Sequence, residues 1–307
     1  MHLAQHVYQD WRVCVVMPAR NEAAHILQAT TSLPEWIDRI IVVDDGSTDE
    51  TASLVKNAEI ISTGGIGVGG AIAAGYQHLV KSEGEQRWCA VVMAGDGQMN
   101  PSDLPILLAQ IINCEADFVK GDRGAHEDGL SAMPIRRRLG TWWLKHLTNM
   151  ATGLSIHDPQ CGYTVCNDRM LQTWDFSNNW NGYGYPNWWL LQCMEYDIKI
   201  KEAPVKAVYE GQSSGIKIFT FLPIVSGMLL KGLFSRGSRW YLLGQSKATF
   251  TQRATISIGF LGGSALLFSI PLIGPVGLCG IFGLGVARKV DATLLRQLET
   301  TQVDPRA

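Results

Sequence analysis

Short apolar runs alternate with stretches of helical period from residue 12 to about residue 121. Runs rich in β-branched residues predict strands at 13–17, 39–43, 90–94 and 117–120. The strings VCVVM, IIVVD and AVVMA are apolar on both faces, as expected of strands that helices cover on each side. The pattern therefore predicts an α/β domain with a mostly parallel sheet and helices on both of its faces.

The rest of the chain follows a different pattern. Residues 122–215 are aromatic and less periodic, and we interpret them as the acceptor half of one catalytic domain, 1–215. Residues 216–252 are apolar with spaced lysines and arginines, which favours amphipathic helices in a membrane interface, with core helices as the alternative.

A long uncharged segment follows, from Ala254 to Ala287. It exceeds the ~20 residues of one membrane span but falls short of the ~40 that two spans need. Gly274 and Pro275 interrupt it, and basic residues flank both ends, so we expect a short membrane hairpin at 253–290 with both ends cytoplasmic. A polar tail, 291–307, completes the predicted organisation.

Composition narrows the classes of function. The net charge of -2 provides no overall attraction to nucleic acid. The 7 cysteines form no CxxC pair, which argues against a zinc site and a disulfide framework. The first residues lack the apolar core of a signal peptide, so we expect the catalytic domain to face the cytoplasm.

Polar turns follow the first two predicted strands. PARNE contains Pro18, Arg20 and Glu22, and DDGSTD contains Asp44 and Asp45. Carboxylates at adjacent ends of parallel strands can accept hydrogen bonds from a nucleobase and a ribose. A helix N-cap in DDGSTDET is the alternative explanation for part of this string.

The glycine-rich string GGIGVGG contains a match to the dinucleotide fingerprint G-x-G-x-x-G, ending with Gly69 and Gly70. A dehydrogenase is therefore an alternative. The fingerprint normally follows the first strand of its fold, however, and here other acidic turns precede it. We favour a close-packed helix start beside a nucleotide.

The string AGDGQ follows the predicted strand at 90–94 and contains Asp96 and Gln98. A carboxylate and an amide oxygen two residues apart on a turn can share a hard cation such as Mg²⁺ or Mn²⁺, which bridges diphosphate oxygens. The alternative is a βα turn in which backbone amides satisfy Asp96.

These strings, together with GDR and DPQCGY, resemble glycosyltransferase family 2, and within it the polyprenyl-phosphate (dolichyl-phosphate mannose synthase-like) branch. The resemblance covers about residues 12–215. It implies a GT-A fold, an inverting mechanism and a nucleotide-sugar donor held through Mg²⁺ or Mn²⁺. It also implies a donor site, which comprises Pro18, Arg20, Glu22, Asp44, Asp45, Gly69, Ala94, Gly95 and Asp96. Asp96 and Gln98 are the implied metal ligands, and Ala94 replaces the first aspartate of the family's Asp-x-Asp motif.

The acceptor site also follows from the resemblance. Relatives that act on hydroxyl groups carry an acidic general base where this chain reads PNWW, with Asn187. An ionised phosphate needs no base, so the substitution favours a polyprenyl phosphate acceptor. The resemblance places Arg123 at the acceptor phosphate and Asp158 at the sugar, so that Asp96, Arg123 and Asp158 are the expected catalytic residues. Further acceptor residues are Arg136, Arg137 and Gln160, although the arginines also suit a solvated charge cluster.

The sequence thus predicts a membrane-attached glycosyltransferase that uses a donor of the GDP-mannose or UDP-glucose type. One alternative is transfer to a lipid or glycan hydroxyl. Another is a non-catalytic membrane protein that binds nucleotide sugars. Arg236 to Trp240 match an RxxRW pattern of hydroxyl-directed relatives, which we interpret as coincidence. The sequence leaves open whether the chain forms a homo-oligomer.

Overall fold

The computed structural model describes residues 8, 10–127, 135–196, 198–206, 218–243, 248–263 and 275–301. The chain forms two compact units. The first consists of Met1–Lys145 and Ile156–Val225, and the second of His146–Ser155 and Ser226–Ala307.

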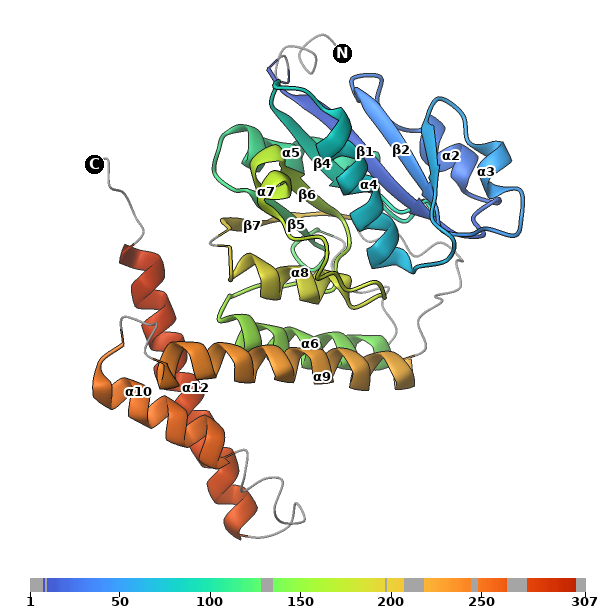
Figure 1. Ribbon diagram of the computed structural model, residues 1–307. Coiled ribbons are helices and arrows are strands. Elements are labelled where there is room, and N and C mark those ends of the chain that lie inside the picture. The colour runs from blue at the N-terminus through green and yellow to red at the C-terminus, as the bar shows by residue number, and fades with distance from the viewer. Residues whose placement is uncertain are drawn as a thin grey trace. The chain divides into compact units, whose positions relative to one another are not determined.

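A sheet of seven strands forms the centre of the first unit within the described residues (Figure 1). The strands are β1 (Arg12–Ala19), β2 (Arg39–Asp44), β3 (Glu59–Ser62), β4 (Trp88–Val92), β5 (Phe118–Asp122), β6 (Thr164–Asn167) and β7 (Ile200–Pro204). Their order across the sheet is β3-β2-β1-β4-β6-β5-β7. β6 runs antiparallel to both of its neighbours, whereas the other pairs are parallel. The prediction of an α/β fold with a mostly parallel sheet is confirmed.

The four predicted strands correspond to β1, β2, β4 and β5, with ends displaced by at most two residues. The other three strands are short and lack a clear apolar run, as IKEAP in β7 illustrates. The carboxyl ends of β1, β2, β4, β5 and β7 lie at one edge of the sheet because these strands share one direction. This edge is where an open α/β sheet binds its ligands.

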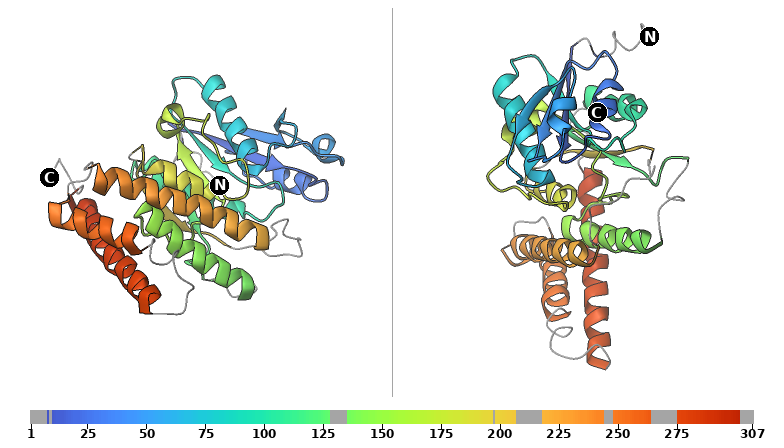
Figure 2. Two further views of the ribbon diagram at one scale, coloured as in Figure 1. Left: turned by 60° about the horizontal axis from the view of Figure 1, so that its bottom comes forward. Right: turned by 90° about the vertical axis from the view of Figure 1, so that its right-hand side faces the viewer.

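Helices cover both faces of the sheet (Figure 2). α2 (Ile26–Thr31) and α5 (Leu104–Ile112) bury their apolar side chains in a core with alternate residues of β1. α4 (Val68–Ser82) crosses the opposite face so closely that a Cβ added to Gly75 would lie 2.4 Å from Val16. The other helical segments of this unit are α3 (Thr51–Leu54), η1 (Pro101–Asp103), α7 (Asp168–Thr173) and α8 (Tyr185–Cys193).

Aromatic side chains fill the core between α4, α8 and the sheet. Trp189 on α8 stacks on Trp174 at 4.3 Å between ring centroids and also contacts Tyr76 and Phe118. Trp174 and Trp189 are buried, so these two tryptophans pack the core. This arrangement fixes α8 against the sheet and thereby positions the residues at its N-terminal end.

Helices make up the described part of the second unit. These are α9 (Ile218–Gly237), the π-helix η2 (Ser238–Leu242), α10 (Phe250–Ser257), the π-helix η3 (Ile258–Gly262) and α12 (Pro275–Thr301). The boundaries between the units fall within α9, within α6 (Ile135–Thr152) and after Ser155, shortly beyond the end of α6. A Cβ on Gly259 would lie 2.6 Å from that of Ala287, so η3 and α12 are closely packed.

A buried ion pair joins α9 to α12 in the second unit. Arg236 lies 2.7 Å from Asp291 and donates to the carbonyl oxygens of Met150 and Ala151 at 2.8 and 3.0 Å. The Tyr241 hydroxyl also donates to Asp291. The Arg236 guanidinium lies 5.1 Å from the centre of the Trp240 ring. Packing therefore accounts for both ends of the RxxRW pattern.

The C-terminal region differs in part from the sequence-based expectation. α12 begins at Pro275, where the sequence predicts a break, and continues to Thr301. The first part of the predicted polar tail is therefore helical, because Asp291 and Leu294 are buried in the unit. The tip of the predicted hairpin, 264–274, lies outside the described residues. Of the helices described, none has both the length and the apolar character that a bilayer span requires.

Candidate active site

The turns after β1 and β2 are joined by hydrogen bonds. Asn21 adopts a left-handed φ of 56°, and its backbone N–H donates to the Ser47 hydroxyl at 3.0 Å. The Asn21 side chain accepts from the backbone N–H of Thr48 at 2.8 Å. The backbone N–H of Glu22 donates to the Thr51 hydroxyl at 2.7 Å. The two predicted donor turns therefore lie side by side.

Asp45 holds the glycine-rich loop in place. Its carboxylate, only 3% exposed, accepts from the Thr63 hydroxyl and from the backbone N–H groups of Ile66 and Gly67, each at 2.7 Å. Burial alone raises the pKa of Asp45, but these donors and the nearby Arg20 charge bring the pKa below its ordinary value. The Asp45 carboxylate thus accepts three hydrogen bonds from the protein. The neighbouring Asp44 carboxylate accepts fewer hydrogen bonds from the protein.

Asp44 and Arg20 both lie next to this loop. Asp44, 8% exposed, accepts from the backbone N–H of Ser47 at 3.1 Å. A Cβ on Gly65 would lie 3.8 Å from Nη1 of Arg20, so the guanidinium lies against the glycine-rich loop. The donor residues predicted after β1 and β2 are therefore close to one another.

The glycine-rich loop packs against the segment before α8. The backbone N–H groups of Gly69 and Gly70 donate to the Asn181 carbonyl oxygen at 2.8 and 3.3 Å. A Cβ on Gly69 would lie 2.0 Å from the Trp180 carbonyl oxygen, so only glycine fits. In a dinucleotide-binding fold, N–H groups at this position would donate to a pyrophosphate. Here Gly69 and Gly70 donate theirs to Asn181 instead. Close packing explains the glycines, and the dehydrogenase alternative loses its main support.

The Asp96 turn is attached to the end of β1. The backbone N–H of Gly95 donates to the Pro18 carbonyl oxygen at 3.1 Å, and Oδ1 of Asp96 accepts from the backbone N–H of Gln98 at 3.0 Å. Ala94, at the position of the missing aspartate, donates its N–H to the Met99 sulfur at 3.3 Å. Asp96 therefore projects from the same sheet edge as the two donor turns.

Glu22 and Asp96 are two carboxylates at this edge, and the charge of Asp96 acts on Glu22. Burial raises the pKa of Asp96, whereas the Gln98 N–H and the nearby His25 lower it. Burial also raises the pKa of Glu22, and the charge of Asp96 raises it further. Two neighbouring carboxylates fit a divalent cation, because a cation removes their mutual repulsion.

A second charged group surrounds the end of β5. Arg123 donates from Nε and Nη2 to the two carboxylate oxygens of Asp158, at 2.7 and 3.0 Å. Burial raises the pKa of Asp158, but Arg123 and then Lys120 bring the pKa below its ordinary value. The Lys120 ammonium is fully buried and donates to the Cys161 carbonyl oxygen at 2.6 Å. Arg123 and Asp158, predicted separately, are direct partners.

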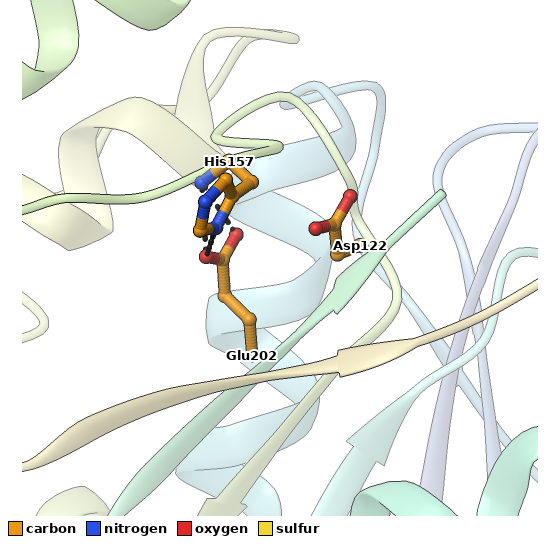
Figure 3. Close-up of side chains that lie close together, drawn as sticks. All are labelled: Asp122, His157 and Glu202. Carbon is orange, nitrogen blue, oxygen red and sulfur yellow. Dashed lines mark hydrogen bonds and ion pairs between the residues drawn. The ribbon is translucent and has the colours of Figure 1, made fainter. Parts of the chain in front are cut away.

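Asp122, His157 and Glu202 lie close together (Figure 3), and the first two are the chain neighbours of Arg123 and Asp158. The ligand atoms of the three residues all lie within 4.8 Å of one another. Nδ1 of His157 is 2.8 Å from Oε2 of Glu202. Glu202 also accepts from the backbone N–H groups of His157 and Asp158, at 2.8 and 3.0 Å, and so fixes the loop that carries Asp158.

Gln160 contacts the residue that replaces the general base. Its Nε2 donates to Oδ1 of Asn187 at 2.7 Å, and Asn187 is fully buried at the N-terminal end of α8. An amide therefore occupies this position within reach of the 157–161 loop. The side chains of Arg136 and Arg137 lie outside the described residues, although their backbone forms the start of α6.

The sequence does not single out Lys120 or Glu202. Lys120 lies inside a buried strand, where lysine is rare. A lysine within a predicted strand was therefore the sequence feature that could have identified it. Glu202 lies on β7, a strand that its pattern did not predict. The sequence does identify Glu22, but for the donor rather than as a neighbour of Asp96.

The seven-stranded sheet with polar turns at one edge is the arrangement of a GT-A-like domain. Residues 14–174, just over half of the 307-residue chain, match the family described as glycosyl transferase family 2. The chain therefore belongs to this family and is a glycosyltransferase.

Curated relatives agree with this assignment. The UDP-N-acetylglucosamine–dolichyl-phosphate N-acetylglucosaminyltransferase of Methanococcus voltae is 26% identical over 68% of this chain and 94% of the relative. A dolichyl-phosphate beta-glucosyltransferase of Trichomonas vaginalis is 27% identical over 73% of this chain and 72% of the relative.

A solved structure shares the fold. Glucosyl-3-phosphoglycerate synthase from Mycobacterium tuberculosis, in complex with UDP, superposes with a TM-score of 0.54 at 20% identity. The superposition covers 76% of this chain and 82% of that one. Structures of the same enzyme also contain Mn²⁺ or Mg²⁺.

Proposed function

We propose that this glycosyltransferase moves a sugar from a nucleoside diphosphate sugar to a polyprenyl phosphate at the cytoplasmic face of a membrane, with inversion at the anomeric carbon. The donor is of the GDP-mannose or UDP-glucose type. Two dolichyl-phosphate transferases among the relatives support the acceptor class. The comparison with a UDP-bound structure supports a nucleotide donor through the shared fold.

The observation that carries the proposal is the buried amide of Asn187 beside Gln160. A hydroxyl acceptor must lose its proton during attack, and a carboxylate is the usual base for this step. An amide cannot take up that proton at neutral pH. A phosphate acceptor is already ionised and attacks without such help.

Arg123 suits the acceptor phosphate. A guanidinium has five N–H donors, and Asp158 accepts two of them in a planar arrangement. Asp158 thereby fixes the direction of the guanidinium, and we assign it a positioning role. Bidentate geometry makes arginine well suited to phosphate oxygens.

The donor would bind along the ends of β1, β2 and β4. Asp44 and Arg20 are placed to contact the nucleoside, and Asp96 with Glu22 would hold Mg²⁺ or Mn²⁺ at the diphosphate. When bound, this ion stabilises the negative charge of the departing nucleoside diphosphate. The protein aligns the acceptor oxygen with the anomeric carbon, opposite to the leaving group, so that direct attack inverts the configuration.

Membrane attachment belongs to the same proposal. In the second unit, Phe250 on α10, Ile258 on η3 and Phe282 on α12 are each more than 70% exposed. Exposed apolar side chains of this size favour contact with lipid over water. We assign this face of the second unit to the membrane interface, where a lipid-linked phosphate is found.

One experiment tests the proposed reaction. Purified full-length protein is incubated with a panel of nucleotide sugars and a short polyprenyl phosphate, and the product is heated in mild acid. A sugar phosphate is labile under these conditions, whereas a glycoside made from a hydroxyl acceptor is stable. A stable product, or no product with any donor, would overturn the proposal.

Membrane attachment needs its own test. Phe250→Ser, Ile258→Ser and Phe282→Ser are combined in one variant, and flotation with anionic vesicles is compared with that of the unchanged protein. We expect a clear loss of flotation with an unchanged melting temperature. Full retention of vesicle binding would show that another surface attaches the chain.

A further inference from the structure

We propose that Asp122, His157 and Glu202 form a second metal site, which binds a divalent transition metal ion such as Mn²⁺ separately from the ion expected at Asp96. Metal binding at this site does not depend on the proposed acceptor. The inference goes beyond the proposed function because no step of sugar transfer requires this ion.

The sheet brings the two carboxylates together. β5 and β7 are parallel, with Lys120 paired to Glu202 and Asp122 paired to Pro204. Side chains two residues apart on a strand point to the same face, and so do directly paired residues. Asp122 and Glu202 therefore lie diagonally across two neighbouring strands on one face. His157 reaches them from the loop before β6, as Figure 3 shows.

The ligand set is that of a transition metal. One imidazole nitrogen and two carboxylate oxygens lie within 4.8 Å of one another, close enough for all three to reach one ion after small adjustments. Mg²⁺ prefers oxygen ligands throughout, whereas Mn²⁺ and Zn²⁺ accept an imidazole nitrogen. The set therefore selects against Mg²⁺.

Backbone hydrogen bonds hold one of the two Asp122 carboxylate oxygens. The residue is only 7% exposed, and its Oδ1 accepts from the backbone N–H groups of Gly124 and Ala125 at 2.8 and 3.2 Å. Within the described residues, no hydrogen bond to its Oδ2 is found, so this oxygen can coordinate an ion. A cation between the Asp122 and Glu202 carboxylates would offset their mutual repulsion.

The neighbouring positive charges are directed elsewhere. Lys120 donates to the Cys161 carbonyl oxygen, and Arg123 donates two N–H groups to Asp158. The His157 side chain is 67% exposed, which gives a dissolved ion a path to the site. An ion bound here would also link β5 and β7 to the loop that carries Asp158. It would thereby restrict the motion of Asp158, which positions Arg123.

Glu202 has a simpler role as well, since it accepts the backbone N–H groups of His157 and Asp158. A carboxylate has about four acceptor positions, so this role is compatible with metal binding. The test must therefore detect the metal itself rather than the stability of the loop.

The test is a Mn²⁺ titration of full-length protein, with free Mn²⁺ followed by electron paramagnetic resonance. The Asp96→Asn variant serves as the background, because it weakens the expected donor site. We expect one equivalent of Mn²⁺ to remain bound. Adding His157→Gln or Asp122→Asn should lower that affinity by at least about tenfold. Melting temperatures of the same samples show that the variants are folded.

His78→Gln provides a matched control in the same unit. His78 also pairs with a glutamate, Glu59, at 2.6 Å, but Arg39 occupies that carboxylate at 2.6 Å and repels cations. We expect this variant to bind Mn²⁺ as the background does. The proposal is wrong if Asp96→Asn alone removes all binding, or if His157→Gln and His78→Gln behave alike.

Discussion

Asp45 and Asp158 are both buried near the same edge of the sheet, yet different groups hold them. Asp45 accepts from a hydroxyl and two backbone amides, all neutral. Asp158 is held by the Arg123 guanidinium. The proposed donor half of the site is thus shaped by hydrogen-bonded turns, whereas the proposed acceptor half is built from paired charges.

This difference between neutral and charged partners indicates which residues can also bind a ligand. Neutral donors fix a loop and contribute no net charge to attract a substrate. A guanidinium held from one side keeps its positive charge and its planar shape, so it can orient an anion while remaining in place. Substitutions in the two halves should therefore affect different kinetic and thermodynamic quantities.

Asp96→Ala should give the largest effect, because the expected ion loses a carboxylate that Ala94 cannot replace. We expect turnover to fall by about a hundredfold to a thousandfold. The rate is measured with saturating donor over a range of Mn²⁺ concentrations. Glu22→Gln should also lower turnover at a given Mn²⁺ concentration, but by a smaller factor than Asp96→Ala. Full activity of Asp96→Ala would remove Asp96 from the metal site.

Arg123→Ala should follow, and it tests the acceptor half. We expect kcat/KM for the polyprenyl phosphate to drop by about tenfold to a hundredfold, with little change in the KM of the donor. The variant also leaves Asp158 buried without its partner, which should cost about 3–5 kcal/mol of stability.

The double variant Arg123→Ala with Asp158→Ala is the matched control for that prediction. It removes both charges, so it should recover part of the stability while acceptor use stays impaired. Recovery of acceptor use together with stability would mean that Arg123 acts only by supporting the fold.

Gly69→Ala tests the donor half without changing any charge. The new Cβ would meet the Trp180 carbonyl oxygen, so the loop or the segment before α8 must move. We expect a loss of about 1–3 kcal/mol in unfolding free energy and a higher KM for the donor. Gly84→Ala is a suitable control, because a Cβ there would meet nothing within 4 Å. Equal stability of the two variants would contradict the close packing.

Asp45→Asn should have the smallest effect, and it depends on pH. Because its neighbours hold the pKa of Asp45 below the ordinary value of about 3.9, the ionised form stabilises the fold at neutral pH. We expect a loss of about 1 kcal/mol at pH 7, which shrinks as the pH falls below about 4. Melting curves across this range provide the measurement. A difference that stays constant down to acid pH would assign the effect to shape rather than charge.

The sequence is a good guide to the strands that carry apolar runs. β1, β2, β4 and β5 are recognisable because helices bury both of their faces. β7 is not, since its string IKEAP has two adjacent charged residues and ends in a proline. Glu202 and its contact with His157 were therefore invisible, because that contact requires knowing which strand lies beside β5.

Partners within the site are harder to predict than its members. Asp45, Arg123 and Asp158 each stand in a recognisable string, yet the sequence does not reveal that the last two pair with each other. Nor does it reveal that the backbone of the glycine-rich loop satisfies Asp45. Such contacts depend on how turns from separate strands meet, and local periodicity carries no information about that.

The buried Arg236–Asp291 pair has a practical consequence for anyone who shortens this protein. A fragment that ends before α12 would lack Asp291, the only carboxylate that pairs with Arg236 within the described residues. The Arg236 guanidinium would then be a buried cation without its ion-pair partner. Such a fragment should misfold or aggregate for reasons unrelated to lipid, so the last helix belongs in every expression design.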